Sequence, residues 1–527
     1  MDYRKIGKIL GKIMILEAIL MVAPLVVSFV YKETLLHSIA FIIPIVILTA
    51  IGFLLQIPKP KRNSLYQKEG FAVTALVWVI MTLFGAIPFV INGDIPNYAD
   101  ACFEIMSGFT TTGSSVIPDI TAVSHSTLFW RSFSHWIGGM GILVFVLIFI
   151  PESNDGSSMH LLRAESPGPQ VGKIVSKMKV TTRILYLIYL VMTALQIIIL
   201  CCDPVTDYNA MCQDLGVEMA TAYQNDRVFH AFLATFGCAG TGGFGFMVGS
   251  MEYFTPFAQY VVSIFLILFG CNFSLYYLLL IGKIKAVFRS EEFRSYFLIV
   301  GAAVGFVFLS LVGKFEAFPQ VYTTEEAFRH SLFQVSSLMT TAGYTTTDYD
   351  VWPMLAKTTL VMVMFIGAMA GSTAGGIKVS RIVMSVKGAY INVRKLINPR
   401  YVPKAKFEGK TLEQKTINDV FAFITLYFFI FLAGIFLLSF DGVNGQIVNI
   451  ASDAGQYEVK HGFFSNFSAV LTCISNVGPA FEAVGPYSSF AGYNDFSTVI
   501  LTLIMMLGRL EILPVLILFN FRTWKKM

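Results

Sequence analysis

The chain of 527 residues is 55% hydrophobic and only 13% charged, with a formal net charge of +5. Soluble domains usually carry about 25% charged residues, so this composition excludes an ordinary soluble protein and indicates a polytopic membrane protein. The basic residues collect in short loops between apolar runs rather than in a basic domain, which argues against nucleic-acid binding.

Ten apolar runs are long enough to cross a bilayer, which takes about 20 residues. They lie near 9–30, 37–57, 70–92, 128–150, 183–202, 257–282, 295–314, 355–383, 418–440 and 497–521. The first run is followed by no small-residue cleavage site, so we expect it to be retained as a span and not removed as a signal peptide.

The positive charges alternate from one connection to the next. Lys and Arg cluster at the start, after the second, fourth, sixth and eighth runs, and at the end. Positive clusters that flank spans mark the cytoplasmic side. Because the number of spans is even, the sequence predicts that both termini are cytoplasmic and that the remaining, more acidic connections face outward.

Four outer connections contain a short, moderately apolar segment that ends in small residues. They read ACFEIMSGFTTTGSS (101–115), ATFGCAGTGGFG (234–245), LFQVSSLMTTAGYTTTD (332–348) and SAVLTCISNVGPAF (468–481). After the first two spans, the chain therefore repeats one unit four times, consisting of a span, a short helix, a small-residue stretch and a second span.

This unit divides the chain into five parts. Residues 1–66 hold two extra N-terminal spans, and the four repeats occupy 67–180, 181–290, 291–414 and 415–527. We expect an all-α polytopic membrane protein with four membrane–pore–membrane repeats around one pore.

The short helices point to an ion pathway. A helix of about 12 residues cannot cross the hydrocarbon, and the irregular backbone after it must be buried in protein or line water. Four such backbones around an axis bring carbonyl oxygens together that replace the hydration shell of a cation. A single Thr- or Gly-rich stretch is equally typical of close helix packing, so the fourfold recurrence carries the prediction.

Several motifs resemble the Trk/Ktr/HKT superfamily of potassium transporters, and most closely its TrkH branch. The matching stretches are SGFTTTGSS, RSFSHWIGGMGI (131–142), AGTGGF (239–244), TTAGYTTTD (340–348), GSTAGGIKVSR (371–381), NVGP (476–479) and LGRLE (507–511). The resemblance implies potassium uptake across the plasma (inner) membrane of a bacterium. It also implies a homodimer and a cytosolic nucleotide-binding regulatory subunit.

The resemblance places a potassium selectivity filter in the four small-residue stretches. In the second repeat Gly240, Gly242 and Gly243 compete for the filter position, and the aromatic residue after Gly243 favours that glycine. The expected filter residues are Thr111, Thr112 and Gly113; Thr241, Gly242 and Gly243; Thr341, Ala342 and Gly343; and Asn476, Val477 and Gly478. Glycine at all four final positions favours potassium, whereas serine in the first repeat of the plant branch goes with sodium.

A second glycine-rich run lies inside the second span of the third repeat. Its residues are poor helix formers, and a broken helix at membrane depth is tolerated where it lines a cavity. The resemblance implies an intramembrane gate made of Gly371, Ser372, Thr373, Ala374, Gly375, Gly376 and Lys378. It also implies that Arg509, a charge inside the last span, projects into the pore below the filter. Close packing of the glycines and snorkelling of the arginine are the alternatives.

Two other functions are alternatives to potassium uptake. The same fold transporting sodium, or sodium and potassium, is the nearer alternative. A polytopic membrane enzyme is the more distant one, but the seven Cys and seven His form no CxxC, HExxH or other ligand spacing. We therefore expect a transporter or channel whose potassium ion is cargo, with no catalytic cofactor. Arg131 and His135 are expected to be structural, bonding the outer loops.

Overall fold

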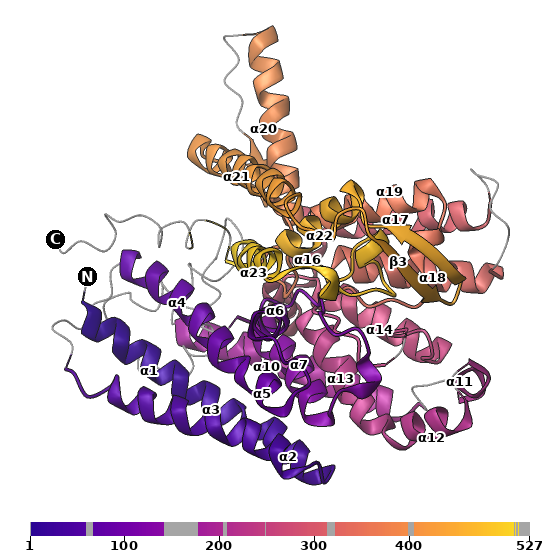
Figure 1. The fold of residues 1–527 in the computed structure, drawn as a ribbon. Coiled ribbons are helices and arrows are strands. Elements are labelled where there is room, and N and C mark those ends of the chain that lie inside the picture. Colours follow the sequence, from indigo (N-terminus) through magenta and orange to yellow (C-terminus); the bar gives the residue numbers. More distant parts are fainter. Residues whose placement is uncertain are drawn as a thin grey trace.

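The computed structural model describes residues 2–59, 67–141, 178–203, 208–214, 216–247, 249–313, 322–398, 405–510, 512 and 515. Over these ranges the chain is mainly helical (Figure 1). Two small antiparallel hairpins, which the sequence patterns did not suggest, join the helices in loops. They are formed by β1 (Lys406–Phe407) with β2 (Lys410–Thr411) and by β3 (Ile447–Ser452) with β4 (Gly455–Lys460).

The N-terminal segment forms a helical hairpin beside the first repeat. Helices α1 (Tyr3–Leu20) and α2 (Val22–Val30) are followed by α3 (Leu35–Leu54), which packs against α1 (Figure 1). A Cβ on Gly11 would lie 2.6 Å from the carbonyl oxygen of Gly52, so the two helices touch backbone to backbone at this point. Small residues at such crossings are typical of membrane helix pairs.

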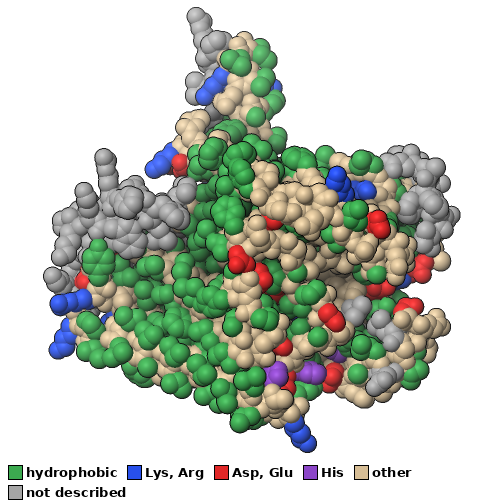
Figure 2. All heavy atoms as spheres, in the orientation of Figure 1, with side chains coloured by type: hydrophobic (Ala, Val, Ile, Leu, Met, Phe, Trp, Pro, Cys, Tyr) green, Lys and Arg blue, Asp and Glu red, His purple; other side chains and the backbone are tan. Residues whose placement is uncertain are grey.

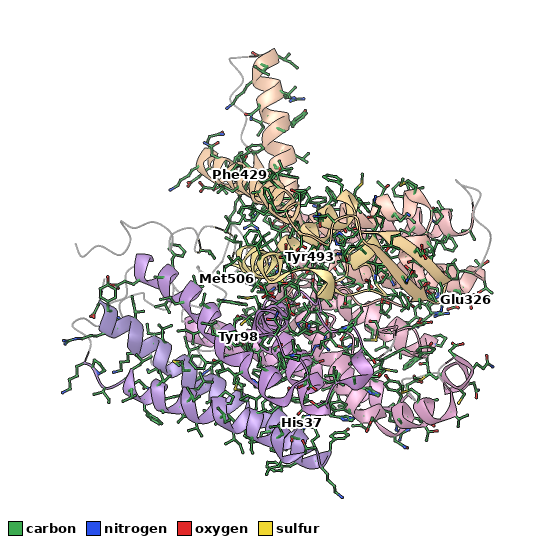
Figure 3. The ribbon with its side chains drawn as sticks, viewed as in Figure 1. His37, Tyr98, Glu326, Phe429, Tyr493 and Met506 are labelled. Atoms are coloured by element: carbon green, nitrogen blue, oxygen red, sulfur yellow. The ribbon has the colours of Figure 1, made fainter. Side chains whose placement is uncertain are left out.

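The first span of each repeat is long and apolar. These spans are α4 (Gln67–Gly85) with α5 (Ile87–Asn92), α10 (Met178–Cys201), α17 (Glu291–Leu311) and α21 (Gln414–Leu438). Together with the two N-terminal spans they make six helices, among the described residues, that are long and apolar enough to cross a membrane. The chain is thus a polytopic membrane protein. Figure 2 shows the apolar side chains that cover α1 and α3, and Figure 3 shows Phe429, which is 68% exposed on α21.

The described helices of the second spans are shorter, and the parts of the expected spans at 142–150 and 516–521 lie outside the described residues. These helices are α7 (His125–Gly139), α14 (Pro256–Phe269), α19 (Met354–Ile366) and α23 (Asp495–Arg509). Where the sequence suggested one continuous span at 257–282, α14 and α15 (Phe273–Leu280) meet at a 91° bend. The run at 355–383 divides into α19 and α20 (Val379–Ile397), joined by a non-helical loop at 367–378.

Four short buried helices complete the repeats: α6 (Tyr98–Phe109), α13 (Arg227–Gly240), α18 (Thr324–Met339) and α22 (Phe463–Ser475). Their starts are fixed locally. Asn97 caps α6 through Ala99, and Thr323 and Glu326 form a capping box on α18. Each short helix contacts the second span of its own repeat and that of the preceding repeat, and α6 contacts α23. The eight helices therefore close into a ring around one axis.

The remaining elements lie in the loops. They are the helices α11 (Tyr208–Asp214), α12 (Val217–Asn225) and α16 (Ile284–Arg289) and the 3-10 turns η1 (Ile120–Ala122), η2 (Tyr349–Val351), η3 (Glu482–Val484) and η4 (Phe490–Gly492). Helix α20 stands away from the ring in Figure 1, whereas Met506 of α23 and Tyr493 lie near the middle of the molecule in Figure 3.

Candidate ion-conduction site

The four small-residue stretches adopt one backbone conformation. One or two residues after the end of each short helix, a residue has the left-handed backbone conformation. Its φ is 55° at Thr111, 54° at Thr241, 57° at Thr341 and 58° at Asn476. Two residues later a glycine also has positive φ in every repeat: Gly113, Gly243, Gly343 and Gly478. This agreement is independent of sequence identity, because the four stretches share few residues.

Hydrogen bonds fix this conformation at the end of each short helix. The N–H of Thr112 donates to the carbonyl of Ser107 at 2.8 Å, and Gly242 donates to Gly237 at the same distance. The third and fourth repeats repeat the pattern with Ala342 to Ser337 at 2.8 Å and Val477 to Thr472 at 2.9 Å. A bond of this type satisfies a helix-terminal carbonyl and follows a left-handed cap.

The four stretches meet in a closed ring of backbone contacts, which we call the glycine ring. A Cβ on Gly113 would lie 1.9 Å from the carbonyl oxygen of Gly242, and one on Gly243 would lie 1.9 Å from that of Ala342. The cycle continues from Gly343 to the oxygen of Val477 at 2.1 Å and closes from Gly478 to the oxygen of Thr112 at 2.8 Å. Only glycine fits this backbone at the first three contacts.

The ring also defines the equivalent residues of the second repeat, which the sequence left open. Thr241 and Gly243 have the positive φ values of Thr111 and Gly113, whereas Gly240 is still helical. The carbonyl of Gly242 occupies the same place in the cycle as that of Thr112. The geometry therefore aligns Thr241, Gly242 and Gly243 with the other three stretches.

The loop at 367–378 lies directly against these stretches. The N–H of Gly375 donates to Thr341 Oγ1 at 2.7 Å, and that of Gly376 donates to the carbonyl of Ser475 at 2.9 Å. A Cβ on Gly375 would lie 2.3 Å from the same Ser475 oxygen. The absence of a side chain lets the loop approach the ends of the third and fourth short helices.

Thr373 is the point where the loop reaches the other repeats. Its Oγ1 donates to the carbonyl of Phe269 at 3.3 Å, and its Cγ2 lies near Gly139. Arg509 donates to the Thr373 carbonyl at 2.8 Å and to the carbonyls of Gly138 and Gly139 at 2.6 and 3.0 Å. A residue contacted by the second spans of three repeats lies close to the axis of the ring.

The two ends of the loop are held by charged groups. Lys378 is 2% exposed, has φ of 80°, and its Nζ donates to the carbonyl of Ala374. The carboxylate of Glu292, on α17, accepts from the N–H of Ala370 at 2.7 Å. The sequence did not single out Glu292. A carboxylate at the start of a helix usually only stabilises the positive end of the helix dipole, so its contact with the loop could not be expected.

Comparisons with known proteins identify the family of the chain. The TrkH family profile, described as a cation transport protein, matches residues 37–525. The chain belongs to the TrkH family. It is 30% identical over the full length of both chains to the Trk system potassium uptake protein TrkH of Escherichia coli, and 29% identical, again over both full lengths, to the TrkH protein of Halomonas elongata. The crystal structure of the potassium transporter TrkH from Vibrio parahaemolyticus superimposes with a TM-score of 0.81 at 28% identity and covers both chains completely.

A buried ion pair supports the first stretch of this TrkH-family chain. Arg131 is 1% exposed, and its Nε donates to Glu104 Oε1 at 2.7 Å. Its other nitrogens donate to the carbonyl of Gly245 at 3.0 Å and to Ser115 Oγ at 3.1 Å. The pair joins the loops that follow the glycine ring in two repeats, as expected for a structural arginine.

His135 makes a second bridge between the same two repeats. Its Nδ1 lies 2.9 Å from the carbonyl of Gly108, and its Nε2 accepts from the N–H of Phe244 at 3.3 Å. These partners require a neutral ring with the proton on Nδ1. His135 therefore positions the first two stretches and does not hold an ion.

A cavity of about 460 Å³ lies above the ring, on the side opposite the 367–378 loop. Gly113, Gly243 and Gly343 form its floor, and Asn449 and Ala451 of strand β3 contribute to its wall. We call it the vestibule. The sequence did not predict that a hairpin from the fourth repeat borders this space, because the 441–462 loop shows no strong strand pattern.

Two buried carboxylates with raised pKa values lie behind the vestibule wall, Glu252 next to Tyr487 and Asp350 next to Gly485. Burial raises the pKa of Glu252 to about 7, and its Oε2 accepts from Tyr487 Oη at 2.8 Å. Burial, together with the nearby Asp348, raises the pKa of Asp350 to about 7. Asp119 differs, because hydrogen bonds from Thr121 hold its pKa below the ordinary value. Behind the vestibule wall, the carboxyl groups of Glu252 and Asp350 thus change charge near neutral pH.

Proposed function

We propose that the chain carries potassium into the cell through the glycine ring. The observation that carries the proposal is the closed cycle of four equivalent backbone contacts, in which each ring glycine lies against the carbonyl of Thr112, Gly242, Ala342 or Val477 in the next repeat. A ring of backbone carbonyl oxygens replaces the hydration shell of a dehydrated cation. The residues proposed for the filter are the twelve that the sequence suggested.

The electrostatics of the short helices support a cation at this position. All four helices end immediately before the ring, so the negative ends of their dipoles point toward it. Thr111 Oγ1 and Asn476 Oδ1 are buried and have no hydrogen-bond partner among the described residues. Both oxygens follow a short helix at the same position in their repeats and are suited to stabilise a partly hydrated cation.

Steric exclusion at the ring supports potassium rather than sodium. A serine in place of Gly113 would place its Cβ 1.9 Å from the Gly242 carbonyl while holding φ at 85°. The ring of this chain therefore requires glycine at position 113. The sodium-associated branch of the superfamily has serine at this position, so the glycine favours potassium. An inside-negative potential drives uptake by about 2.3 kcal/mol per charge per 100 mV.

We propose that the 367–378 loop closes the path in this conformation. The gate residues are Gly371 to Gly376 together with Lys378 and Arg509, and their contacts at Thr373 support this role. The guanidinium of Arg509 adds a positive charge below the ring. Displacing the loop breaks the bond from Arg509 to the Thr373 carbonyl, while the bonds to Gly138 and Gly139 hold the guanidinium on α7; this arrangement gives the gate a defined closed state.

We further propose a homodimer in a bacterial inner membrane, with cytoplasmic termini and a cytosolic nucleotide-binding regulatory subunit. Helix α20 supports an assembly, because it continues directly from the gate and carries exposed apolar side chains at Val386, Val393 and Leu396. A partner that moves α20 would pull on the loop that precedes it.

Ion flux in liposomes tests the proposal. Purified protein should pass rubidium, a potassium substitute, much faster than sodium, and empty liposomes should pass neither. Equal sodium and rubidium flux through the unmutated protein would remove potassium selectivity and support the sodium-transporting alternative.

A further inference from the structure

A large basic pocket lies outside the ion path, next to the bend of the second repeat. Its volume is about 930 Å³, and it lies between α15, α16 and the turn of the β1–β2 hairpin. Lys283, Lys285 and Arg289 line it together with the apolar side chains of Leu275, Leu278 and Ile284. We call it the basic pocket. Nothing in the proposed conduction path uses these three cations.

The cations are available to a ligand. In the part of the chain that the structure describes, no carboxylate pairs with any of them, and all three are exposed. The one carboxylate that lines the pocket, Glu408, is already engaged. Its Oε1 accepts from Ser290 Oγ and from the N–H of Glu292, both at 2.9 Å. The pocket therefore offers positive charge to a ligand with several acceptor oxygens.

The position of the pocket indicates what that ligand is. Helix α15 turns away from α14 by 91° and leads from the 367–378 loop to the basic connection at 283–294, which is expected on the cytoplasmic side. Its end carries exposed apolar residues, including Leu280 at 73% exposure and Ile281 at 45%. The next long helix, α17, begins at Glu291 and re-enters the membrane. A mixed wall of cations and aliphatic side chains at this level matches a phosphate headgroup with its acyl chains.

We propose that the basic pocket binds an anionic phospholipid and that this lipid regulates the gate. The inference rests on the proposed orientation and gate. The phosphate lies among Lys283, Lys285 and Arg289, and the acyl chains follow the apolar face of α15. A soluble anion matches only the charged half of this wall, and an acidic protein segment would have to enter the level of the acyl chains.

A short chain of contacts joins the pocket to the gate. Glu408 binds the N-terminal turn of α17 at Ser290 and Glu292, and Glu292 in turn holds the N–H of Ala370 in the 367–378 loop. A smaller cavity of about 150 Å³ lies between them and is lined by Glu408, Glu292 and Ala370. A phosphate in the basic pocket repels the Glu408 carboxylate, which weakens the bonds of Glu408 to Ser290 and Glu292 and so alters the contact between Glu292 and Ala370 in the loop.

Native mass spectrometry of the detergent-purified full chain tests the binding step without any transport. Phosphatidylglycerol is added to the unmutated protein and to the triple variant Lys283→Gln, Lys285→Gln, Arg289→Gln. Each charge near a membrane surface contributes roughly a factor of five, so the variant should bind about 100-fold more weakly. The control variant Lys395→Gln, Lys410→Gln, Lys415→Gln removes three other exposed cations and should bind like the unmutated protein. Equal binding by all three proteins overturns the proposal.

Two further arms identify the occupant. Inorganic phosphate at millimolar concentration should not displace the lipid, because it lacks acyl chains; displacement would make the pocket a phosphate site instead. If the triple variant keeps its lipid but loses association with a cytosolic regulatory protein, the pocket is a protein-docking surface and the lipid assignment fails.

Rubidium flux in liposomes then tests regulation. Flux through the unmutated protein should change at least threefold between neutral phosphatidylcholine and mixtures with phosphatidylglycerol, and flux through the triple variant should not change. Glu408→Gln should bind lipid normally but lose the response. An identical lipid response in the triple variant overturns regulation. Loss of potassium selectivity in every protein would contradict the proposed function and leave the lipid-binding result standing.

Discussion

The glycine ring and the layer directly below it differ in how alike the four repeats are. In the glycine ring the four repeats are nearly interchangeable, with the same backbone angles, the same helix-terminal bond and the same contact to the next repeat. Immediately below, each second span ends differently. In the second repeat it bends by 91° just after α14, in the third it opens into the 367–378 loop, and in the fourth the last residue of the described helix α23 is Arg509.

The difference has a physical reason. Selecting a spherical ion requires similar oxygens on all sides, which only equivalent repeats provide. Closing a path requires one element to occupy the axis, which four equivalent elements cannot do without colliding. A single chain with four divergent repeats satisfies both demands, whereas four identical subunits would carry the same gate four times.

The largest expected effect comes from breaking the equivalence of the ring. Gly113→Ala adds a Cβ 1.9 Å from the Gly242 carbonyl, so the ring must widen. We expect at least a tenfold loss of rubidium preference over sodium, or about 1.4 kcal/mol of discrimination. Gly93→Ala is the matched control, because Gly93 has φ of 86°, against 85° for Gly113, but nothing within 4 Å. Similar losses in both variants would show that backbone strain alone is responsible.

The second effect comes from removing the asymmetric layer. Deletion of residues 371–376 should raise rubidium flux by about 30-fold, equivalent to ~2 kcal/mol of barrier, with selectivity unchanged. Gly375→Ala should raise flux in the same direction, because its Cβ would meet the Ser475 carbonyl at 2.3 Å. Gly442→Ala serves as a control, because a Cβ on Gly442 would meet nothing within 4 Å. A deletion that leaves flux unaltered would exclude the loop as the gate.

A smaller effect is expected at the arginine. Arg509→Ala removes both the charge and three carbonyl bonds, and flux should rise roughly fivefold, or ~1 kcal/mol. Arg509→Lys keeps the charge but not the three bonds, so it separates the two contributions. If the lysine variant behaves like the unmutated protein, charge is the barrier; if it behaves like the alanine variant, the bonds to Thr373, Gly138 and Gly139 are. No change in Arg509→Ala would remove the residue from gating.

The smallest effect concerns the vestibule. The carboxyl of Glu252, with its pKa raised to about 7, is mostly neutral at pH 6 and mostly ionised at pH 8. The added negative charge raises the local cation concentration, so uptake at low ionic strength should rise about twofold over this range. Glu252→Gln should reduce the rise, and the remainder is expected from Asp350, whose pKa is also raised to about 7. Asp119→Asn should lower uptake at both pH values alike, because the lowered pKa of Asp119 keeps it ionised throughout. An unchanged pH profile in Glu252→Gln would contradict this account.

The sequence predicted the symmetric layer better than the asymmetric one. The small-residue stretches recur four times in the sequence. In the second repeat, the aromatic residue Phe244 after Gly243 favoured the alignment that places Thr241 and Gly243 with the other repeats. Hydropathy suggested one span at 257–282, but the backbone bends between α14 and α15. Hydropathy could not reveal this bend, because the residues on both sides of it are equally apolar. The hydrogen bond from the N–H of Ala370 to Glu292 joins residues far apart in the chain, so no local sequence pattern could predict it.

Thallium, an electron-rich substitute for potassium, tests the central claim most directly. Crystals of the protein soaked in thallium should show anomalous density on the axis enclosed by the carbonyls of Thr112, Gly242, Ala342 and Val477, and excess potassium should displace it. Thallium density confined to the vestibule, with none at the level of the four carbonyls, would contradict the account.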